Sequence, residues 1–286
     1  MVGTLYLVAT PIGNLEDITY RAVRVLAEVD VIACEDTRRT RVLLDHYGIK
    51  AKTISYHEHN EHERATELAE QLERGTNIAI VSDAGTPGIN DPGFRLVREC
   101  ARRGVPVVPV PGATAFVAAL IASGLPTNDF FFGGFLPSRS TARRARLTEV
   151  RLLPTTLVFY EAPHRLFFAL TDAREILGER DAAVVRELTK LHEEIARGSL
   201  SELAMRFADE NAARGEFVLV INRAANDDTT AMDADDAMSL AARVAAFESE
   251  GLDARAALKR AARESGLSRS EAYRRLVAER ARHHIE

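Results

Sequence analysis

Strand-like and helix-like segments alternate through the first 125 residues, and this alternation limits the possible folds more than any other feature of the chain. Repeated strand–helix units build a parallel sheet with helices on both faces. The segments between the strands repeat apolar residues at helical spacing. The predicted strands are short runs rich in β-branched and aliphatic residues, at 4–10, 31–34, 53–56, 77–82 and 106–110.

Beyond this region the pattern predicts a smaller mixed α/β domain and a helical tail. The segment 125–129 contains a proline and an asparagine and indicates a hinge. In the second domain, residues 194–198 are expected to pair antiparallel, and the acidic segment 226–236 indicates a linker before helices that resemble a helix-turn-helix. We therefore expect an N-terminal α/β domain at 1–125, a second α/β domain at 126–225, and a linker with a helical tail at 226–286.

The charge is unevenly distributed along the chain. The net charge is -5 at pH 7, but the segment 138–151 holds five arginines and one glutamate. Local basic patches attract phosphates whatever the total charge is. We expect 138–151 to be a mobile loop that becomes ordered on RNA.

Several features indicate a cytoplasmic protein. No apolar run is long enough to span a bilayer, and the N-terminus lacks the pattern of a signal peptide. The only two cysteines, Cys34 and Cys100, lie in apolar stretches without a further cysteine or histidine at metal-ligand spacing. They are interpreted as reduced thiols in the protein core.

The loop after the fourth predicted strand is the most unusual stretch. Residues 83–93 hold three glycines, two prolines and two aspartates. Ligands of open parallel sheets bind at the carboxyl ends of the strands, and this loop offers fixed backbone groups to a carboxylate, an amino group or a ribose. The alternative is a plain turn, although ordinary connections need only about two to six residues.

Other common sites find little support in the sequence. The loop after the first strand has one glycine, which argues against a dinucleotide-binding fingerprint, and no Walker sequence occurs. His57 and His59 lie on the same side of an extended segment, but no third metal ligand is evident. We expect a solvated loop there and no metal in the protein.

Several longer motifs match a known family. In chain order from about residue 4 to about residue 222, the chain resembles the family of ribosomal RNA small subunit methyltransferase I. This family belongs to the tetrapyrrole-methylase-like fold. The matching segments are 4–19, 35–38, 82–93, 109–113, 134–137, 159–165, 186–190 and 214–218.

The resemblance implies a two-domain homodimer that holds S-adenosylmethionine in the cleft between the domains. It also implies methyl transfer to the ribose 2'-hydroxyl of a cytidine of 16S rRNA near the decoding site, with naked rRNA or the small ribosomal subunit as the partner. The wider fold often has a Gly-rich loop after the first strand. This chain has Pro11-Ile12-Gly13-Asn14 instead, which argues against a porphyrin substrate.

The resemblance also implies which residues contact the cofactor. Ser82–Gly85 would contact its methionine end, and Pro11 would lie under the sulfonium. For Tyr160, Leu188 and Phe217, which come from the second domain, the alternative is ordinary core packing. The implied residues are Pro11, Ser82, Asp83, Ala84, Gly85, Thr114, Ala115, Tyr160, Leu188, Glu216 and Phe217.

A ribose hydroxyl is a poor nucleophile and needs a group that accepts its proton. Lys190 is the first candidate, and Asp36 and Glu58 are alternatives. The acids near Lys190, at 187, 193 and 194, would raise its pKa unless burial or Arg186 outweighs them. The alternative for Lys190 is a surface ion pair.

Arginine and histidine side chains are candidates for contacts to RNA phosphates. They are Arg38, Arg139, Arg143, Arg144, Arg146, His164 and Arg165.

Two other classes of function stay open. One is a related methyltransferase that acts on a small molecule of the tetrapyrrole type or on a protein side chain, and the other is a non-enzymatic RNA-binding protein.

Overall fold

A computed structural model of the protein describes residues 1–209, 215–224, 240–249, 251–264, 272 and 276. The chain separates into two compact units, Met1–Ala224 and Ala225–Glu286. The linker predicted at 226–236 lies outside the described residues, as does the helix start predicted at 268–271. None of the described helices has the length and apolar character needed to cross a membrane.

The first sheet confirms the predicted parallel fold. Its strands pair in the order β3-β2-β4-β1-β5, and all of these pairs are parallel. The central strand β4 is buried at every position, as expected for a strand covered on both faces. The strands are β1 (Leu5–Val8), β2 (Val31–Cys34), β3 (Lys52–Ser55), β4 (Ile78–Val81) and β5 (Val107–Val110).

Helices cover both faces of this sheet. Alternate strand residues point to opposite faces, so Leu5 packs with α3 and α4 while Val8 packs with α1 and α2. Thr19 begins α1 by accepting a hydrogen bond from the Ala22 amide, at 3.1 Å. The elements are α1 (Tyr20–Glu28), α2 (Thr37–His46), α3 (Glu61–Glu73), α4 (Phe94–Arg103) and the 3-10 helix η1 (Leu15–Asp17).

The second sheet is mixed, as predicted. Its order is β6-β7-β10-β8-β9, where β6 and β7 are parallel and the other pairs are antiparallel. The predicted antiparallel pairing of 194–198 is confirmed by β9. The strands are β6 (Phe130–Phe135), β7 (Thr156–Glu161), β8 (Asp181–Arg186), β9 (Glu194–Ser199) and β10 (Phe217–Ile221).

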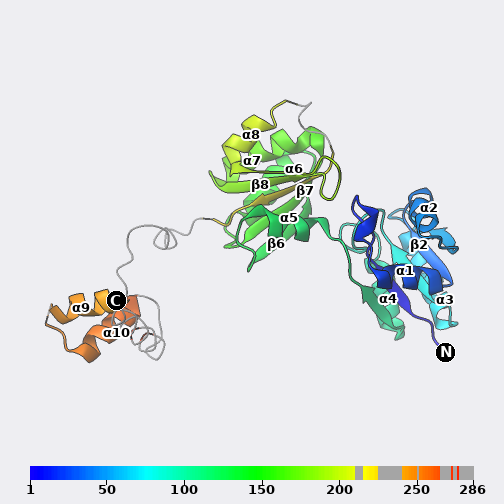
Figure 1. The fold of residues 1–286 in the computed structure, drawn as a ribbon, viewed down its shortest axis with the longest axis horizontal. Helices are drawn as coiled ribbons and strands as arrows, with labels where there is room; N and C mark the ends of the chain where they lie inside the picture. The colour runs from blue at the N-terminus through cyan, green and yellow to red at the C-terminus, as the bar shows by residue number, and fades with distance from the viewer. Residues whose placement is uncertain (210–214, 225–239, 250, 265–271, 273–275, 277–286) are drawn as a thin grey trace. The chain divides into compact units, whose positions relative to one another are not determined.

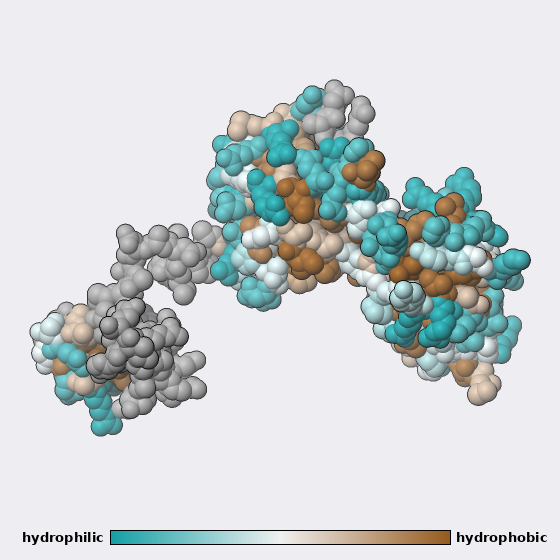
Figure 2. Space-filling view, in the orientation of Figure 1, coloured by the Kyte–Doolittle hydropathy of each residue, from teal (hydrophilic) through white to brown (hydrophobic). Residues whose placement is uncertain are grey.

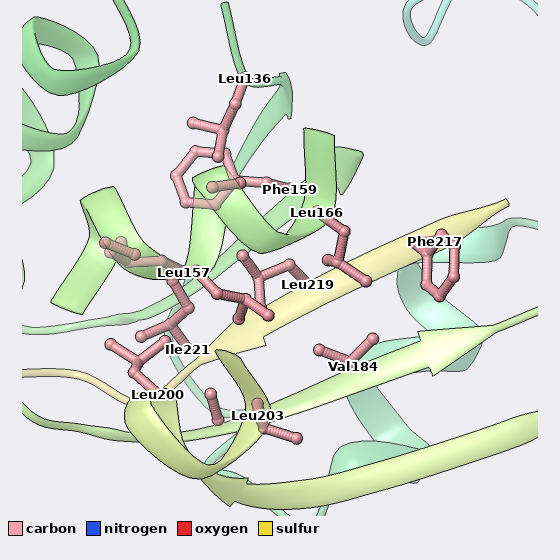
Figure 3. Packing of buried hydrophobic residues seen from close by; sticks show 14 of the residues in the cluster. Leu136, Leu157, Phe159, Leu166, Val184, Leu200, Leu203, Phe217, Leu219 and Ile221 are labelled. Carbon is pink, nitrogen blue, oxygen red and sulfur yellow. The ribbon is translucent and has the colours of Figure 1, made fainter. Parts of the chain in front are cut away.

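Three helices cover one face of the second sheet (Figure 1). They are α6 (Ser140–Val150), α7 (Leu166–Leu177), which follows the 3-10 helix η2 (Pro163–Arg165), and α8 (Leu200–Arg206). Figure 3 shows the apolar core beneath them, in which Phe159 of β7 and Leu219 of β10 lie with Leu166 of α7. Burial of this kind contributes about 25 cal/mol per Å² of apolar surface.

Helix α6 corrects the prediction of a mobile loop at 138–151. Leu147 and Val150 are buried in the core, and Arg143, one turn earlier on the same face, is only 4 % exposed. The sequence interpretation treated every arginine of the segment as solvated. It therefore missed the buried face of α6, on which Arg143 lies with Leu147 and Val150.

Helix α5 (Ala115–Ser123) follows β5 in sequence but packs on the second sheet, on the face opposite α6, α7 and α8 (Figure 1). Ala119 and Leu120 are buried against strands β7, β8 and β10. Arg197 of β9 donates to the carbonyl oxygen of Ser123 at the end of α5, at 2.9 Å. Because α5 packs on the second sheet, the connection between the two sheets lies at 111–114, before the hinge predicted at 125–129.

The unit Ala225–Glu286 contains helices α9 (Leu240–Ser249) and α10 (Ala254–Glu264). Val244 packs with Ala257 and Ala261 in a small apolar core. The guanidinium of Arg260 lies over the Phe247 ring, 4.4 Å from its centroid, so one of the basic side chains of the tail contacts its own unit.

Candidate functional site

The loops after β1 and β4 meet where the connections of the first sheet change direction. The chain leaves β1 toward β2 on one side and leaves β4 toward β5 on the other, and β1 and β4 are neighbours. Open α/β sheets bind their ligands at such a switch point. Here the backbones of Thr10 and Gly85 exchange two hydrogen bonds, of 2.9 and 3.1 Å. The glycine- and proline-rich loop therefore has a fixed position beside the loop that contains Pro11.

A cavity of about 410 Å³ opens at this point, and we call it the large cavity. Its walls come from strand-end loops of the first sheet and from β7, β8, β10 and nearby segments of the second. Thr86 and Thr114 join two of these loops through their hydroxyl groups, 2.8 Å apart. Its volume lies within the range of about 300–1,000 Å³ that is usual for pockets that bind small molecules.

Nine of the eleven residues predicted to contact the cofactor line the large cavity. Tyr160, Leu188 and Phe217, for which core packing was the alternative, are among them. The two others, Pro11 and Ser82, line a neighbouring cavity. The nine residues are Asp83, Ala84, Gly85, Thr114, Ala115, Tyr160, Leu188, Glu216 and Phe217. Their contacts to a cofactor stay predictions. That they line one cavity, however, is a feature of the structure and does not rest on the family resemblance.

The wall of the large cavity is acidic. It includes the carboxyl groups of Asp83, Asp91, Glu161 and Glu216 but only one guanidinium, that of Arg39. Burial raises the pKa of Asp91 to about 6, and the negative charges of Glu35 and Asp83 add to the effect, while a hydrogen bond with Ser82 opposes it. The cavity therefore favours a ligand that carries positive charge.

Glu161 has an unused hydrogen-bonding atom. It is 2 % exposed, and burial raises its pKa. Its Oε1 atom accepts from the Ala162 amide at 2.8 Å and lies 2.9 Å from Arg165 Nη2, whereas its buried Oε2 atom has no partner. A buried carboxylate oxygen without a donor is costly, so a ligand that donates a hydrogen bond fits this wall.

The neighbouring cavity, which we call the small cavity, has a volume of about 260 Å³. Ile12, Arg39, Asp83, Ala84 and Glu216 line both cavities, so the two lie side by side. The other residues of the small cavity come from the loop after β1, from α2, from Ser82 and from Lys190. They are Thr10, Pro11, Gly13, Leu15, Thr40, Val42, Leu43, Ser82 and Lys190.

Lys190 lies at the small cavity as an ion-paired ammonium group. Its Nζ atom is 2.8 Å from Glu187 Oε1 and 3.0 Å from Glu216 Oε2. Burial lowers the pKa of Lys190, but the hydrogen bonds to these two carboxylates outweigh burial and raise it above its ordinary value. In this arrangement Lys190 keeps its proton and forms the ion pair that was considered as its alternative, while a role as the group that accepts the ribose proton stays a prediction.

The other two catalytic candidates line neither cavity. Asp36 begins α2 and binds Arg38 through both carboxylate oxygens, at 3.1 and 2.8 Å, and these contacts hold its pKa at about 2. A carboxylate with so low a pKa is a weak base at neutral pH. Glu58 is exposed on the turn before α3.

The arginines of α6 form ion pairs on the helical face of the second sheet. Buried Arg143 binds Asp172, with Nη2 and Oδ2 2.7 Å apart. Arg144 binds both Asp172 and Glu175, and Arg146 binds Glu149 while its guanidinium lies 5.2 Å from the centre of the Phe131 ring. The prediction of a mobile loop is therefore wrong, whereas RNA contacts by these three arginines stay a prediction, with each already paired to a carboxylate.

The remaining candidates for RNA contacts are scattered. Arg38 is occupied by Asp36, and Arg165 by Glu161. Arg139 is exposed at the start of α6, and His164 is exposed in η2. Arg39, which the sequence interpretation did not single out, is the arginine that lines both cavities. Adjacent arginines in the first turn of a helix point in different directions, and sequence alone did not fix which one faces the site.

The two histidines considered as metal ligands lie together, with ring centroids 5.9 Å apart. Among the described residues, no group of three or more His, Cys, Asp or Glu side chains is arranged to hold a metal ion. Both cysteines are free and buried, as interpreted from the sequence.

Comparisons with known proteins match this fold and site. The family model of "Tetrapyrrole (Corrin/Porphyrin) Methylases" matches residues 4–204. Among solved structures, the methyltransferase CobJ is 22 % identical with a TM-score of 0.59, and the match covers 78 % of this chain and 95 % of that one. Uroporphyrin-III-C-methyltransferase from Thermus thermophilus is also 22 % identical, with a TM-score of 0.54 over 77 % of this chain and 94 % of that one. At such identities these structures show the fold alone. The family model, which covers more than half of the chain, places it among the methyltransferases of the tetrapyrrole-methylase class.

Relatives of higher sequence identity identify one family within this class of methyltransferases. Ribosomal RNA small subunit methyltransferase I of Synechocystis is 47 % identical over 273 residues, which is 95 % of this chain and 96 % of the relative. The protein of the same name from Halalkalibacterium halodurans is 53 % identical over 219 residues, 77 % of this chain and 75 % of the relative. The chain belongs to the ribosomal RNA small subunit methyltransferase I family.

Proposed function

We propose that this chain transfers a methyl group from S-adenosylmethionine to the 2'-hydroxyl of a cytidine in 16S rRNA, near the decoding site, in the cytoplasm. The observation that supports this most directly is the acidic large cavity at the switch point of the first sheet, in a chain of this family. The small-molecule and protein-methylating alternatives have no comparable support, because the tetrapyrrole enzymes among the solved structures are only distantly similar.

The residues of the large cavity suit S-adenosylmethionine. When bound, this cofactor supplies an electrophilic methyl group on a positively charged sulfonium. Asp83, Asp91 and Glu216 offer negative charge to its cationic groups, and the free Oε2 atom of Glu161 offers an acceptor to an amino group. The apolar side chains of Leu188 and Phe217 keep water from the reacting centre, which strengthens the electrostatic interactions inside.

At the small cavity, we propose that protonated Lys190 stabilises negative charge that develops on the attacking ribose oxygen. Its raised pKa suits this role better than that of a base, and the carboxylates of Asp83 and Glu216, which line both cavities, are the candidates for accepting the proton. Lys190→Arg keeps the charge and should retain kcat within about tenfold. Lys190→Gln should lower kcat by about 10²–10³, as loss of one preorganised donor does elsewhere. Equal losses in both variants would contradict the role of the charge.

A methyl-transfer assay with tritiated S-adenosylmethionine tests the function directly. Three acceptors are compared, namely naked 16S rRNA, purified small subunits from cells that lack the modification, and a tetrapyrrole. We expect label in one of the RNA acceptors, and digestion to nucleosides should place it in 2'-O-methylcytidine. Label in the tetrapyrrole alone would contradict the proposal, as would cofactor binding without transfer to any RNA.

We also propose a homodimer that covers helix α5. This helix has no charged residue, yet Ile121 is 71 % exposed and Val117, one turn earlier, is 42 % exposed. Phe130, 44 % exposed, lies beside Phe116 of the same helix. A helix that is apolar on all sides is normally buried, and Figure 2 shows apolar residues gathered on the surface of residues 1–224. Light scattering should give a dimer mass for the wild type and a monomer mass for Ile121→Asp.

A further inference from the structure

We propose that the small cavity receives one unpaired nucleotide of the RNA and that Arg39 binds its phosphate. This inference rests on the proposed function and names the position of the acceptor within it. It goes beyond the sequence predictions, which placed phosphate contacts on Arg38 and on α6.

The small and the large cavity are neighbours with shared walls. In-line transfer requires the attacking atom to lie about 3–3.5 Å from the group it attacks. A ligand in the small cavity is separated from the large cavity only by the residues that line both, among them Ile12 and Ala84. Other surfaces of the described residues that were predicted to contact RNA, such as α6, do not line either cavity.

The small cavity is limited in size. A volume of about 260 Å³ is below the range of about 300–1,000 Å³ for pockets that enclose drug-sized ligands. A cavity of this volume suits one nucleoside. Enzymes that act on a base inside a duplex take that single nucleotide out of its stack, because the target atom is otherwise out of reach.

One wall of the small cavity is apolar. Val42 of α2 is 66 % exposed, although the helix around it is mostly polar. It lines the small cavity together with Pro11, Leu15 and Leu43. An extruded base is commonly held between apolar or aromatic side chains, and the exposed surface of Val42 is available for such a contact.

Arg38 and Arg39 differ in how they are paired. Arg38 donates to both carboxylate oxygens of Asp36 and lines neither cavity. Arg39 has a single ion pair, in which Nη1 is 3.3 Å from Asp83 Oδ2, and its side chain is 70 % exposed. The guanidinium fork of Arg39 therefore has donors left for a phosphate, which it matches in shape and charge.

The test measures binding of cytidine 5'-monophosphate by ligand-observed NMR, with S-adenosylmethionine present. Arg39→Gln should weaken the binding by about tenfold or more, while the matched variant Arg38→Gln should change it by less than about twofold. The affinity for S-adenosylmethionine is measured for each variant by calorimetry. Equal effects of the two substitutions on nucleotide binding would overturn the inference, and so would competition between the nucleotide and the cofactor for one cavity.

A second variant tests the cavity itself. Val42→Trp fills the small cavity from an exposed helical position, so the thermal midpoint should stay close to that of the wild type. It should abolish detectable nucleotide binding and leave cofactor affinity unchanged, because Val42 does not line the large cavity. Nucleotide binding at wild-type strength in this variant would overturn the inference. If the wild type bound no cofactor and methylated no RNA, the proposed function would fail instead.

Discussion

Helix α6 and the loop at 83–93 differ in how their charged groups are satisfied. Both stand out in the sequence, one for its arginines and the other for its glycines, prolines and aspartates. In α6, Arg143, Arg144 and Arg146 all have carboxylate partners. In the loop, burial and the negative charges of Glu35 and Asp83 raise the pKa of Asp91 to about 6.

This difference shows that a density of charge is a poor guide to a binding site. A charged group that is already paired within the fold contributes to stability and has few hydrogen-bond donors or acceptors free for a ligand. A carboxylate held near other carboxylates weakens the fold, and a positively charged ligand relieves that cost. The comparison predicts that substitutions in α6 change stability and that those in the loop change ligand affinity.

The largest effect is expected for Arg143→Ala. Loss of one partner of a buried ion pair costs up to about 3–5 kcal/mol in the free energy of unfolding, and Asp172 would keep only Arg144 and Ser140 as partners. Urea denaturation measures this loss. At a temperature where the variant is still folded, its cofactor affinity should equal that of the wild type. A loss of RNA affinity without loss of stability would break the comparison.

Gly85→Leu should weaken the binding of S-adenosylmethionine by more than about a hundredfold, or about 2.7 kcal/mol. Gly85 lines the large cavity with φ +88°, and a Cβ atom there would lie 3.4 Å from Ile12 Cγ2. Gly88→Leu is the matched control, because Gly88 has φ +83° but open space around it and does not line the cavity. Calorimetry should find cofactor binding in the control, and equal affinity in the two variants would contradict a site at Gly85.

Asp91→Asn should raise the free energy of unfolding by up to about 3 kcal/mol at pH 8 and by little at pH 4. The folded protein holds a proton on Asp91 up to a pKa of about 6, against 3.8 for an ordinary aspartate. Between these two values the folded state binds more protons than the unfolded state, so wild-type stability falls as the pH rises through this range. The asparagine variant lacks this fall, and denaturation at several pH values measures it. The same variant should bind the cofactor more weakly, since stability and function conflict at this position.

The smallest effect is expected for Arg146→Ala. Its partner Glu149 is exposed, and pairs of this kind contribute less than about 1 kcal/mol. If Arg146 bound an RNA phosphate, its removal would lower the slope of log K against log salt by about one. We expect the slope for rRNA to stay as in the wild type. A slope lowered by one would show that Arg146 leaves Glu149 for a phosphate.

Patterns with a short period were sufficient to predict the strands of the first sheet. The apolar run of β4 depends on neighbours in the sequence, and the predicted strand at 77–82 contains the observed one. The site residues in glycine-rich turns also converge as predicted, because the carboxyl ends of parallel strands necessarily meet at one edge.

Three features depended on contacts between distant residues and could not be predicted in this way. The partner of Arg143 is 29 positions away, so its burial is invisible from the basic segment alone. Whether Arg38 or Arg39 faces the site depends on the rotation of α2, which packing decides. The raised pKa of Asp91 results from burial and from Glu35 on another loop.

The crossing of α5 to the second sheet decides where the polypeptide can be divided. A fragment that ends near residue 125 would end in an apolar helix that lacks the strands it packs on. The complementary fragment would expose Val158, Val185 and Val220, and we expect both to aggregate. Division at 111–112 leaves each sheet with its own helices, so split-protein reporters or domain exchanges between relatives should succeed there and fail at 125.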